Sequence, residues 1–476
     1  MQRKIGYHLA KKFAAFIVLF CVPRLVFSAE LAALSWNGVE QEAVTLLTQY
    51  IQIDTTNPPG NETKAAKFFK AIFDREGIEA RIIESAPGRG NIYARLRGTG
   101  SKPAVVLMNH MDVVPADVRQ WQEPPFGAIV KDGYLWGRGA LDMKGPAILQ
   151  LMTVLALKRQ NVRLQGDLIF LGTADEEAGG ALGAGFLLEK QPELFQGVGL
   201  VLNEGGGIRI DENGKARFYS LGVAEKTPLW LKLTATGTAG HGSTPGGNSA
   251  VNKLLTALNR ILHYYAPTKV VPHVQKYYFD SVPLEPSHLH RPYADLKAAL
   301  RDPAFAAEFT KDPRANAAVR NTIAVTLIKG SEKVNVIPAE ALAEIDVRLL
   351  PGEDPKAFIE ELRATIADSS IKIDVTLSFP PAISPEHPEA LKAIKHLAKQ
   401  HDDDVPVLAP LGRGFTDCHY FRERSIPCYG FVPLRASARG DNLVHGIDER
   451  VSLDNLRFGV RMMHELVTQL VTDQNP

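Results

Sequence analysis

Acidic and imidazole side chains recur at five places along this chain of 476 residues, and their types suit the binding of two metal ions. These places are His110, Asp142, the pair Glu176 and Glu177, Glu204, and His445. Most of them follow an apolar run, which is where the strands of an α/β sheet present a ligand-binding edge. Zinc accepts histidine nitrogen and carboxylate oxygen, and a catalytic zinc site keeps one position open for water. The recurrence predicts a single metal centre with hydrolytic chemistry.

The first two places offer different kinds of ligand. In His110-Met111-Asp112 the outer side chains point to the same side of a strand end, so Asp112 could orient the His110 imidazole. Asp142 ends a glycine-rich turn, Gly137 to Asp142, where its two oxygens could bridge two ions. Taken singly, a surface pair and a helix N-cap carboxylate would be simpler explanations.

The other places add carboxylates and a second imidazole. Glu176 and Glu177 follow the apolar run 168–171. One of them could bind metal while its neighbour acts as general base toward the attacking water and then as acid toward the leaving amine. Glu204 precedes three glycines, and His445 precedes the last predicted helix. Alone, each would pass for a solvated turn acid or a structural histidine. Together they favour the metal centre.

Apolar periodicity predicts strands alternating with helices in the first half of the chain. The expected strands are 78–83, 91–96, 104–108, 167–172 and 199–202, and the expected helices are 43–53, 64–75 and 146–159. This order predicts an α/β sheet with mixed or parallel pairing.

From about Glu225 the pattern becomes that of a small α+β unit. Its expected strands are 229–236, 322–328, 341–349 and 371–377, and its expected helices are 250–265 and 354–366, with a mostly helical elaboration at 267–320. Because His445 lies beyond this unit, the C-terminal segment must complete the first domain, and the small domain is an insertion. The expected domains are 30–224 with 380–476, and 225–379.

The N-terminus is expected to lie outside the fold. A basic opening and the apolar stretch 13–22 precede the small residues Ser28 and Ala29, as in a signal peptide. Residues 1–29 therefore predict export to the periplasm or the outside. A membrane anchor at the N-terminus is the alternative, and no other segment is expected to cross a membrane.

Charge and cysteine content narrow the function classes. The net charge is +1 and no long basic run follows the first dozen residues, which argues against nucleic acid as a partner. Cys418 and Cys428 would remain after export. A disulfide and two free thiols are both compatible with their spacing.

Several motifs carry a resemblance to a known family. The runs HMDVVPAD, DGYLWGRGALDMKG, ADEEAGG and GHGSTP are similar to those of the zinc metallopeptidase family M20, which includes glutamate carboxypeptidase, aminoacylase, succinyl-diaminopimelate desuccinylase and yeast carboxypeptidase S. The likeness looks closest to the carboxypeptidase S and N-acyl-amino-acid hydrolase branch. It implies a mixed-sheet α/β/α zinc-peptidase catalytic domain with an inserted α+β lid and dimerisation domain, and hence a homodimer.

The resemblance also implies two zinc ions per chain, although cobalt or manganese would suit the same ligands. The ligand sets would be His110, Asp142 and Glu204 for one ion, and Asp142, Glu177 and His445 for the other. Asp112 would orient the His110 ring, and Glu176 would be the base. The peptide bond between Asp142 and Met143 would be cis.

Three residues of the insertion gain roles through the resemblance. His241 would reach the active site, often that of the partner subunit, and donate to the oxyanion. Asn335 and Arg348 would bind the substrate carboxylate, a task that the arginine fork suits. The chain has Gly414-Phe415-Thr416-Asp417 where relatives often have Gly-Gly-Thr-Asp, so Phe415 is expected to reshape that pocket.

These features predict a carboxypeptidase-type hydrolase that cleaves the amide bond next to a free carboxylate, in a small peptide or an N-acyl amino acid. One alternative keeps the metals and makes the enzyme an N-fatty-acyl-amino-acid hydrolase or synthase, or another aminoacylase. A second is an exported binding protein without catalysis. That alternative predicts lost ligands or a lost base, and this chain keeps all of them.

Overall fold

The computed structural model describes residues 34–437 and 443–473. The expected signal peptide, residues 1–29, lies outside these ranges. From Leu34 onward the chain packs as one compact unit, so the expected domain boundaries near 225 and 379 stay a prediction. Within the described ranges, every helix is too short or too polar to cross a membrane.

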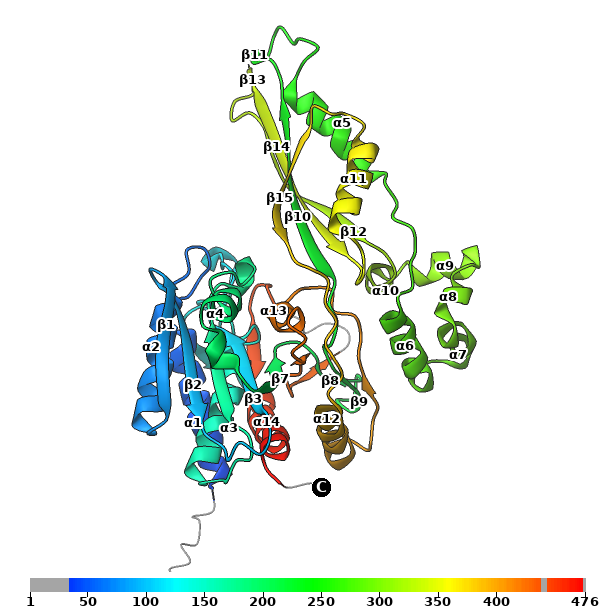
Figure 1. Cartoon of the computed structure of the whole chain (residues 1–476). Helices are drawn as coiled ribbons and strands as arrows, with labels where there is room; N and C mark the ends of the chain where they lie inside the picture. The colour runs from blue at the N-terminus through cyan, green and yellow to red at the C-terminus, as the bar shows by residue number, and fades with distance from the viewer. Residues whose placement is uncertain (1–33, 438–442, 474–476) are drawn as a thin grey trace, which may run out of the picture. The chain divides into compact units, whose positions relative to one another are not determined.

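The larger sheet has six strands of mixed direction (Figure 1). Their order across the sheet is β1 (Glu79–Ala86), β2 (Arg89–Leu96), β6 (Leu168–Thr173), β3 (Ala104–His110), β7 (Val198–Asn203) and β17 (Cys428–Gly430). The last four strands run parallel to one another, and β1 and β2 are antiparallel additions at one edge. The mixed pairing expected from the sequence is confirmed.

Helices cover both faces of this sheet, which is why β3 is apolar at nearly every position. Val105 and Leu107 face one hydrophobic cluster, and Val106 and Met108 face another. The first cluster lies beneath α1 (Trp36–Ile51), α2 (Glu62–Arg75), α3 (Lys144–Arg159), α12 (Pro388–His401) and α14 (Leu453–Val471). The second lies beneath α4 (Ala184–Lys190) and α13 (Cys418–Arg422). The result is the expected α/β/α layering.

A second sheet belongs to residues 225–379, here called the inserted unit. Its antiparallel strand order is β12 (Thr322–Lys329), β14 (Glu340–Leu349), β10 (Thr227–Thr236) and β15 (Lys372–Ser378). Helices α5 (Ala250–Leu262) and α11 (Pro355–Ile366) cover one face, as Figure 1 shows. Alternate residues of β10, such as Leu229 and Leu231, point into that core. β12 is an edge strand of this sheet.

Smaller elements complete the described chain. Helices α6 (Pro272–Ser281), α7 (Ser287–Ala294), α8 (Leu296–Ala299), α9 (Pro303–Phe309) and α10 (Pro313–Ala318) form the expected helical elaboration around an aromatic cluster. One small sheet contains β8 (Gly207–Ile210), β9 (Ala216–Ser220), β16 (Val407–Leu408) and β18 (Arg435–Ser437). Another contains β4 (Ile129–Lys131), β5 (Tyr134–Trp136) and β19 (Arg450–Ser452). A two-stranded ribbon joins β11 (Gly240–His241) to β13 (Val336–Ile337).

Candidate metal centre

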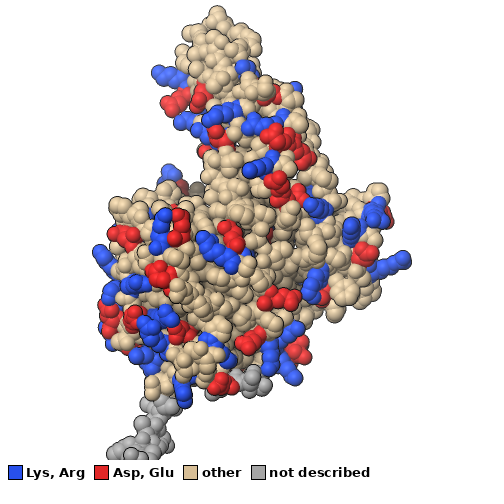
Figure 2. Space-filling model, in the orientation of Figure 1, with Lys and Arg blue, Asp and Glu red and all other residues tan. Residues whose placement is uncertain are grey.

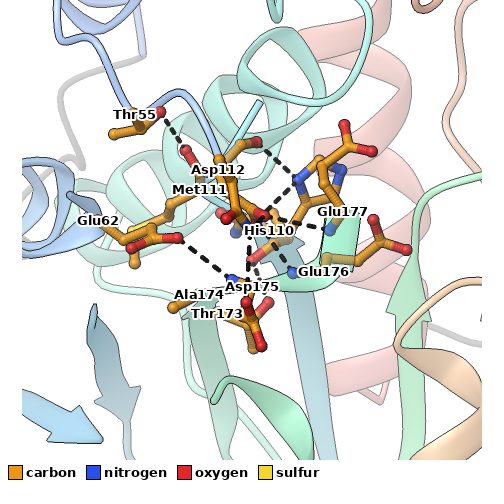
Figure 3. Close-up of polar contacts among 12 residues, drawn as sticks. Thr55, Glu62, His110, Met111, Asp112, Thr173, Ala174, Asp175, Glu176 and Glu177 are labelled. Carbon is orange, nitrogen blue, oxygen red and sulfur yellow. Dashed lines mark hydrogen bonds and ion pairs between the residues drawn. The ribbon is translucent and has the colours of Figure 1, made fainter. Parts of the chain in front are cut away.

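His110 ends strand β3 and is 1% exposed, next to Asp112 (Figure 3). Its Nδ1 lies 2.9 Å from the backbone carbonyl oxygen of Asp112 and 3.5 Å from the Oδ1 of the same residue. A carbonyl oxygen only accepts, so Nδ1 carries the proton and the lone pair of the neutral ring sits on Nε2. The backbone carbonyl of Asp112 therefore holds the ring, with the carboxylate of the same residue beside it, and the orienting role expected of that carboxylate stays a prediction.

The carboxylate of Asp112 instead holds the acidic pair. Its Oδ1 accepts from the backbone N–H of Glu176, and its Oδ2 accepts from that of Glu177, both at 3.1 Å. Asn57 Nδ2 donates to Oδ2 at 2.8 Å. Burial alone would raise the pKa of Asp112, but contact with His110 and these hydrogen bonds lower it below its ordinary value. An ionised Asp112 thus ties the strand end of β3 to the turn after β6.

That turn is the 3-10 segment η2 (Glu176–Ala178), and Asp175 opens it with a left-handed backbone, φ 72°. Arg89 Nη2 lies 2.8 Å from Asp175 Oδ1 and 2.8 Å from Glu62 Oε1, so the three side chains form a buried ion-paired network. Figure 3 shows Glu62 and Asp175 below Asp112. Nothing in the sequence pattern pointed to this network, because its members are far apart in the chain.

Asp142 lies two residues before α3, and its two oxygens face two different imidazoles. Oδ1 lies 2.9 Å from His110 Nε2, and Oδ2 lies 3.2 Å from His445 Nε2. This is the arrangement expected of a bridging carboxylate. The peptide bond from Asp142 to Met143 is cis, as the resemblance implied.

The Asp142 turn is held by Glu449, a fully buried carboxylate that the sequence pattern did not single out. Its Oε1 accepts from the backbone N–H groups of Leu141 and Asp142, at 2.7 and 3.0 Å. Its Oε2 accepts from Arg138 Nη1 at 2.8 Å and from Gly139 N at 3.0 Å. Glu449 follows His445 by four residues, so one segment supplies an imidazole and also orders the turn opposite it.

Glu204 and His445 complete the cluster. Glu204 follows β7, and its Oε2 lies 3.8 Å from His110 Nε2. The turn after it needs glycine at Gly206, because a Cβ there would lie 2.3 Å from the carbonyl oxygen of Gly430. His445 Nε2 lies 3.2 Å from Glu177 Oε2. All six predicted metal-binding and base residues therefore converge on one space.

Concentrated negative charge sets the electrostatics of this space. Burial and the neighbouring carboxylates raise the pKa of Glu204 to about 7. They also hold the pKa of Glu176 well above its ordinary value and raise that of Glu177. Hydrogen bonds to Asp142 and Glu177 raise the pKa of His445 to about 10. These directions indicate a site that needs added positive charge.

The donor set fits divalent metal ions. Each imidazole directs Nε2 at two carboxylate oxygens, which are acceptors, so a proton or a cation must lie between them. Ligand atoms of His110, Glu176 and Glu204 lie within 4.8 Å of one another, and so do those of His110, Asp142 and Glu177. These groups differ from the predicted ligand sets in including Glu176 and omitting His445. The division of ligands between two ions stays a prediction.

The predicted residues of the inserted unit do not join this cluster. His241 and Asn335 are exposed on the β11–β13 ribbon, and His241 Nδ1 lies 2.7 Å from Ser243 Oγ. Arg348 forms a two-point ion pair with Asp346, Nε to Oδ1 at 2.7 Å and Nη2 to Oδ2 at 3.1 Å. Its buried Nη1 has no hydrogen-bond partner in the described structure.

Phe415 and Cys418 lie in the segment 411–422, and Cys428 lies in β17. The Arg348 guanidinium lies over the Phe415 ring, 5.3 Å from its centre, and Phe415 meets Trp230 edge-on at 6.0 Å. The expected reshaping of a carboxylate pocket by Phe415 stays a prediction. Cys418 and Cys428 form a disulfide in the core beside α4, which resolves the choice that their spacing left open.

Comparisons with known proteins agree with this geometry. The N-fatty-acyl-amino acid synthase/hydrolase of Homo sapiens is 30% identical over 462 residues, covering 92% of this chain and 88% of the relative. A probable succinyl-diaminopimelate desuccinylase of Staphylococcus aureus strain N315 is 29% identical over 421 residues, covering 87% and 94%. An M20 family metallo-carboxypeptidase from Sulfolobus solfataricus shares the fold, with a TM-score of 0.66 at 20% identity over 90% of this chain and 99% of that one. Because the model for Peptidase family M20/M25/M40 matches residues 106–469, this chain belongs to that family and is a metal-dependent hydrolase.

Proposed function

We propose that the enzyme cleaves the amide bond between an acyl group and the nitrogen of an amino acid that carries a free carboxylate. The observation that carries this proposal is the pair of imidazole Nε2 atoms that face opposite oxygens of Asp142. That arrangement suits two divalent cations bridged by one carboxylate. We assign zinc to both positions, with cobalt or manganese as possible substitutes.

The proposed ligands are those expected from the family, and two ions bound there would polarise the scissile carbonyl and acidify the attacking water. The first ligand set is His110, Asp142 and Glu204, and the second is Asp142, Glu177 and His445. Asp112 and Glu449 support these ligands, because they accept hydrogen bonds from the turns that carry them.

Glu176 is the proposed base. Its backbone N–H is held by Asp112, and its side chain lies near the ligand atoms of His110 and Glu204. Its carboxylate takes a proton from water as the water oxygen bonds to the carbonyl carbon. It returns that proton to the amide nitrogen as the carbon–nitrogen bond breaks. The products are a carboxylic acid and an amino acid.

The inserted unit is proposed to close over the substrate and to pair with a second copy. Arg348 Nη1 would bind the substrate carboxylate together with Asn335, because this donor has no partner in the described structure. His241 would stabilise the oxyanion in the active site of the partner, since it is exposed and lies outside the cluster of its own chain.

Exposed apolar side chains support pairing through the inserted unit. On the edge strand β12, Leu327 is 42% and Ile328 is 58% exposed, and on α5 Leu255 is 52% and Leu262 is 70% exposed. Unpaired strand edges and apolar patches of this kind attract a second chain. In Figure 2 the end of the molecule that carries β11 and β13 is largely uncharged, which also suits contact with an identical surface.

Export is proposed on separate grounds. The sequence of residues 1–29 has the pattern of a signal peptide, and the Cys418–Cys428 disulfide suits an oxidising compartment. Retention by an uncleaved N-terminus is the minority alternative.

One substrate panel tests the activity. The zinc-loaded enzyme should release leucine from N-acetyl-leucine or from a leucine dipeptide, and should fail on the corresponding C-terminal amides, which lack the carboxylate. Chelation should abolish turnover, and added zinc should restore it. Equal turnover of acid and amide would contradict the carboxylate requirement, and full activity after chelation would contradict the metal centre.

A further inference from the structure

A cavity of about 780 Å³ adjoins the candidate metal centre, with Asp142 and Glu204 in its wall. Its volume lies within the range of pockets that enclose small ligands. The wall is built from segments of the larger-sheet region, and none of its described residues belongs to the inserted unit. It is therefore separate from Arg348 and Asn335, the proposed carboxylate-binding residues.

Much of this wall is apolar. Leu141 lies next to Asp142, and Ile210, Leu434, Val451 and Phe458 line other parts of the cavity. Leu434 and Val451 are buried, and Ile210 and Phe458 are half-buried. An alkyl chain that enters from the metal centre would meet hydrocarbon at several successive positions.

Away from the two metal-centre carboxylates, Asp142 and Glu204, arginines outnumber carboxylates in the wall. Arg209, Arg435 and Arg450 line the cavity, whereas Asp454 is the one described carboxylate in the wall besides the two metal-centre residues. Asp454 is itself paired with Arg457, at 3.1 Å.

Aromatic faces hold two of these guanidinium groups. Arg450 lies over the Trp136 ring at 4.4 Å, and Arg435 lies over Phe458 at 4.6 Å. Arg435 also pairs with Asp402 at 2.7 Å. No carboxylate of the described residues forms an ion pair with Arg209 or Arg450. The cavity therefore combines apolar surface with unneutralised positive charge.

We propose that this cavity, here called the acyl chamber, binds the acyl half of the substrate and selects acyl groups that are extended, apolar and without positive charge. The inference rests on the proposed amide hydrolysis and narrows its substrate class to N-acyl amino acids. A peptide with a free N-terminus carries an ammonium group on its acyl half. Placing that group near the arginines would cost desolvation and like-charge repulsion.

The chain-length dependence of the wild-type enzyme is the first test. Zinc-loaded enzyme is assayed on N-acetyl-, N-butanoyl- and N-octanoyl-leucine. Burial of each added methylene should raise kcat/KM by roughly three- to four-fold until the chamber is filled. A flat series with good N-acetyl-leucine turnover would overturn the chamber and leave the proposed function intact. Turnover of a leucine dipeptide without hydrolysis of any N-acyl-leucine would overturn the chamber alone, and no hydrolysis of either kind of substrate would overturn the proposed function itself.

Charge selection needs no variant and is tested with matched pairs. Propionyl-leucine and glycyl-leucine differ only in a methyl against an ammonium group, and N-octanoyl-leucine and N-(8-aminooctanoyl)-leucine differ at the far end of the chain. The neutral member of each pair should be preferred at least ten-fold, because burying an unpaired charge is costly. Equal kcat/KM within both pairs would contradict the proposed selection.

A chamber-filling variant locates the effect. Ile210→Trp should lower kcat/KM for N-octanoyl-leucine at least ten-fold more than for N-acetyl-leucine, because the indole would occupy the space of the chain. Val130→Trp is the control, since Val130 is 52% exposed on β4 and is not part of the wall. Phe458→Ala, which enlarges the chamber, should move the optimum to longer chains. An unchanged chain-length profile in both chamber variants would place the acyl group elsewhere.

Discussion

The two sheet regions differ in what they bury: the larger-sheet region buries charged pairs, whereas the inserted unit leaves apolar side chains exposed. In the larger sheet both faces are covered by helices, and charged pairs such as Arg89–Asp175 and Arg138–Glu449 are buried beside the candidate metal centre. In the inserted unit only one face carries helices, and apolar side chains such as Leu262 and Ile328 remain exposed.

This difference separates two tasks. Buried ion pairs with every oxygen engaged fix the positions of turns, because breaking one leaves an uncompensated charge in the interior. An exposed apolar edge strand does not hold other parts of its own chain in place. It is instead stabilised when it associates with a second chain. The larger-sheet region is therefore expected to supply the ligands and the base. The inserted unit is expected to supply His241 to the site of a second copy.

The largest effect is expected at Glu176. Glu176→Gln keeps the size of the side chain and removes the proton acceptor, so kcat should fall by roughly a thousand-fold or more. Metal content and the thermal midpoint should stay near those of the wild type, since the turn is held through backbone N–H groups that the variant retains. Turnover assays measure kcat, and metal analysis and thermal unfolding of the same sample measure the metal content and the thermal midpoint. Turnover within ten-fold of the wild type would remove Glu176 as the base.

The next effect tests whether the inserted unit acts across two copies. His241→Ala should lower kcat by roughly a hundred- to a thousand-fold through loss of an oxyanion donor. Mixing and reassembling it with Glu176→Gln should recover about a quarter of wild-type activity, because half of the dimers are mixed and each mixed dimer contains one complete site. Reassembly of either variant alone is the control. No recovery from a mixture of verified dimers would show that His241 serves its own chain or neither.

Glu449 gives an effect of intermediate size, confined to the larger-sheet region. Glu449→Gln places an amide N–H₂ group against donors that now find a carboxylate, so the Asp142 turn should lose order. Zinc affinity should fall by roughly ten- to a hundred-fold, as for other residues that support metal ligands. Competition with a zinc chelator measures this affinity. Glu79→Gln is the control because the Glu79 side chain is 66% exposed. An unchanged zinc affinity would mean that the turn keeps its shape without the four contacts.

The same two regions differ in how well the sequence predicts them. Long periodic elements are predicted closely: the helix expected at 354–366 is α11 (Pro355–Ile366), and the strand expected at 104–108 is β3 (Ala104–His110). The short strands β8 and β18 were not expected. They contain four and three residues, too few for a period, and they pair only because distant segments meet.

For the candidate site, the ligands are easier to predict than their supports. His110, Asp142 and Glu204 stand at strand ends or in a glycine-rich turn, where a motif is visible. Glu449 and Asp175 look like ordinary surface acids in the sequence, and their burial depends on Arg138 and Arg89 arriving from elsewhere in the chain. Spacing also could not decide the state of the two cysteines, because bonded and free thiols fit a separation of ten residues equally well.

The smallest expected effect is on the pH dependence of stability, and it arises from a residue of the larger-sheet region. His464 on α14 packs edge-on against Trp36 at 5.1 Å, and its Nε2 lies 3.0 Å from Gln160 Oε1. Burial lowers its pKa to about 4 from an ordinary value of 6.5. The unfolded chain therefore binds more protons between these values, so stability is full above about pH 6.5 and is lost as the pH falls toward 4.

His464→Phe keeps the ring and removes the titration, so it should flatten this part of the stability profile. With allowance for partial exposure of His464, the difference in unfolding free energy between wild type and variant should change by about 2 kcal/mol from pH 7 to pH 4.5. Urea unfolding of the metal-free proteins across this range measures it. His288→Phe, at an exposed position of the inserted unit, is the matched control and should leave the profile unchanged. Parallel profiles for wild type and His464→Phe would mean that the acid sensitivity arises from the carboxylates of the metal centre instead.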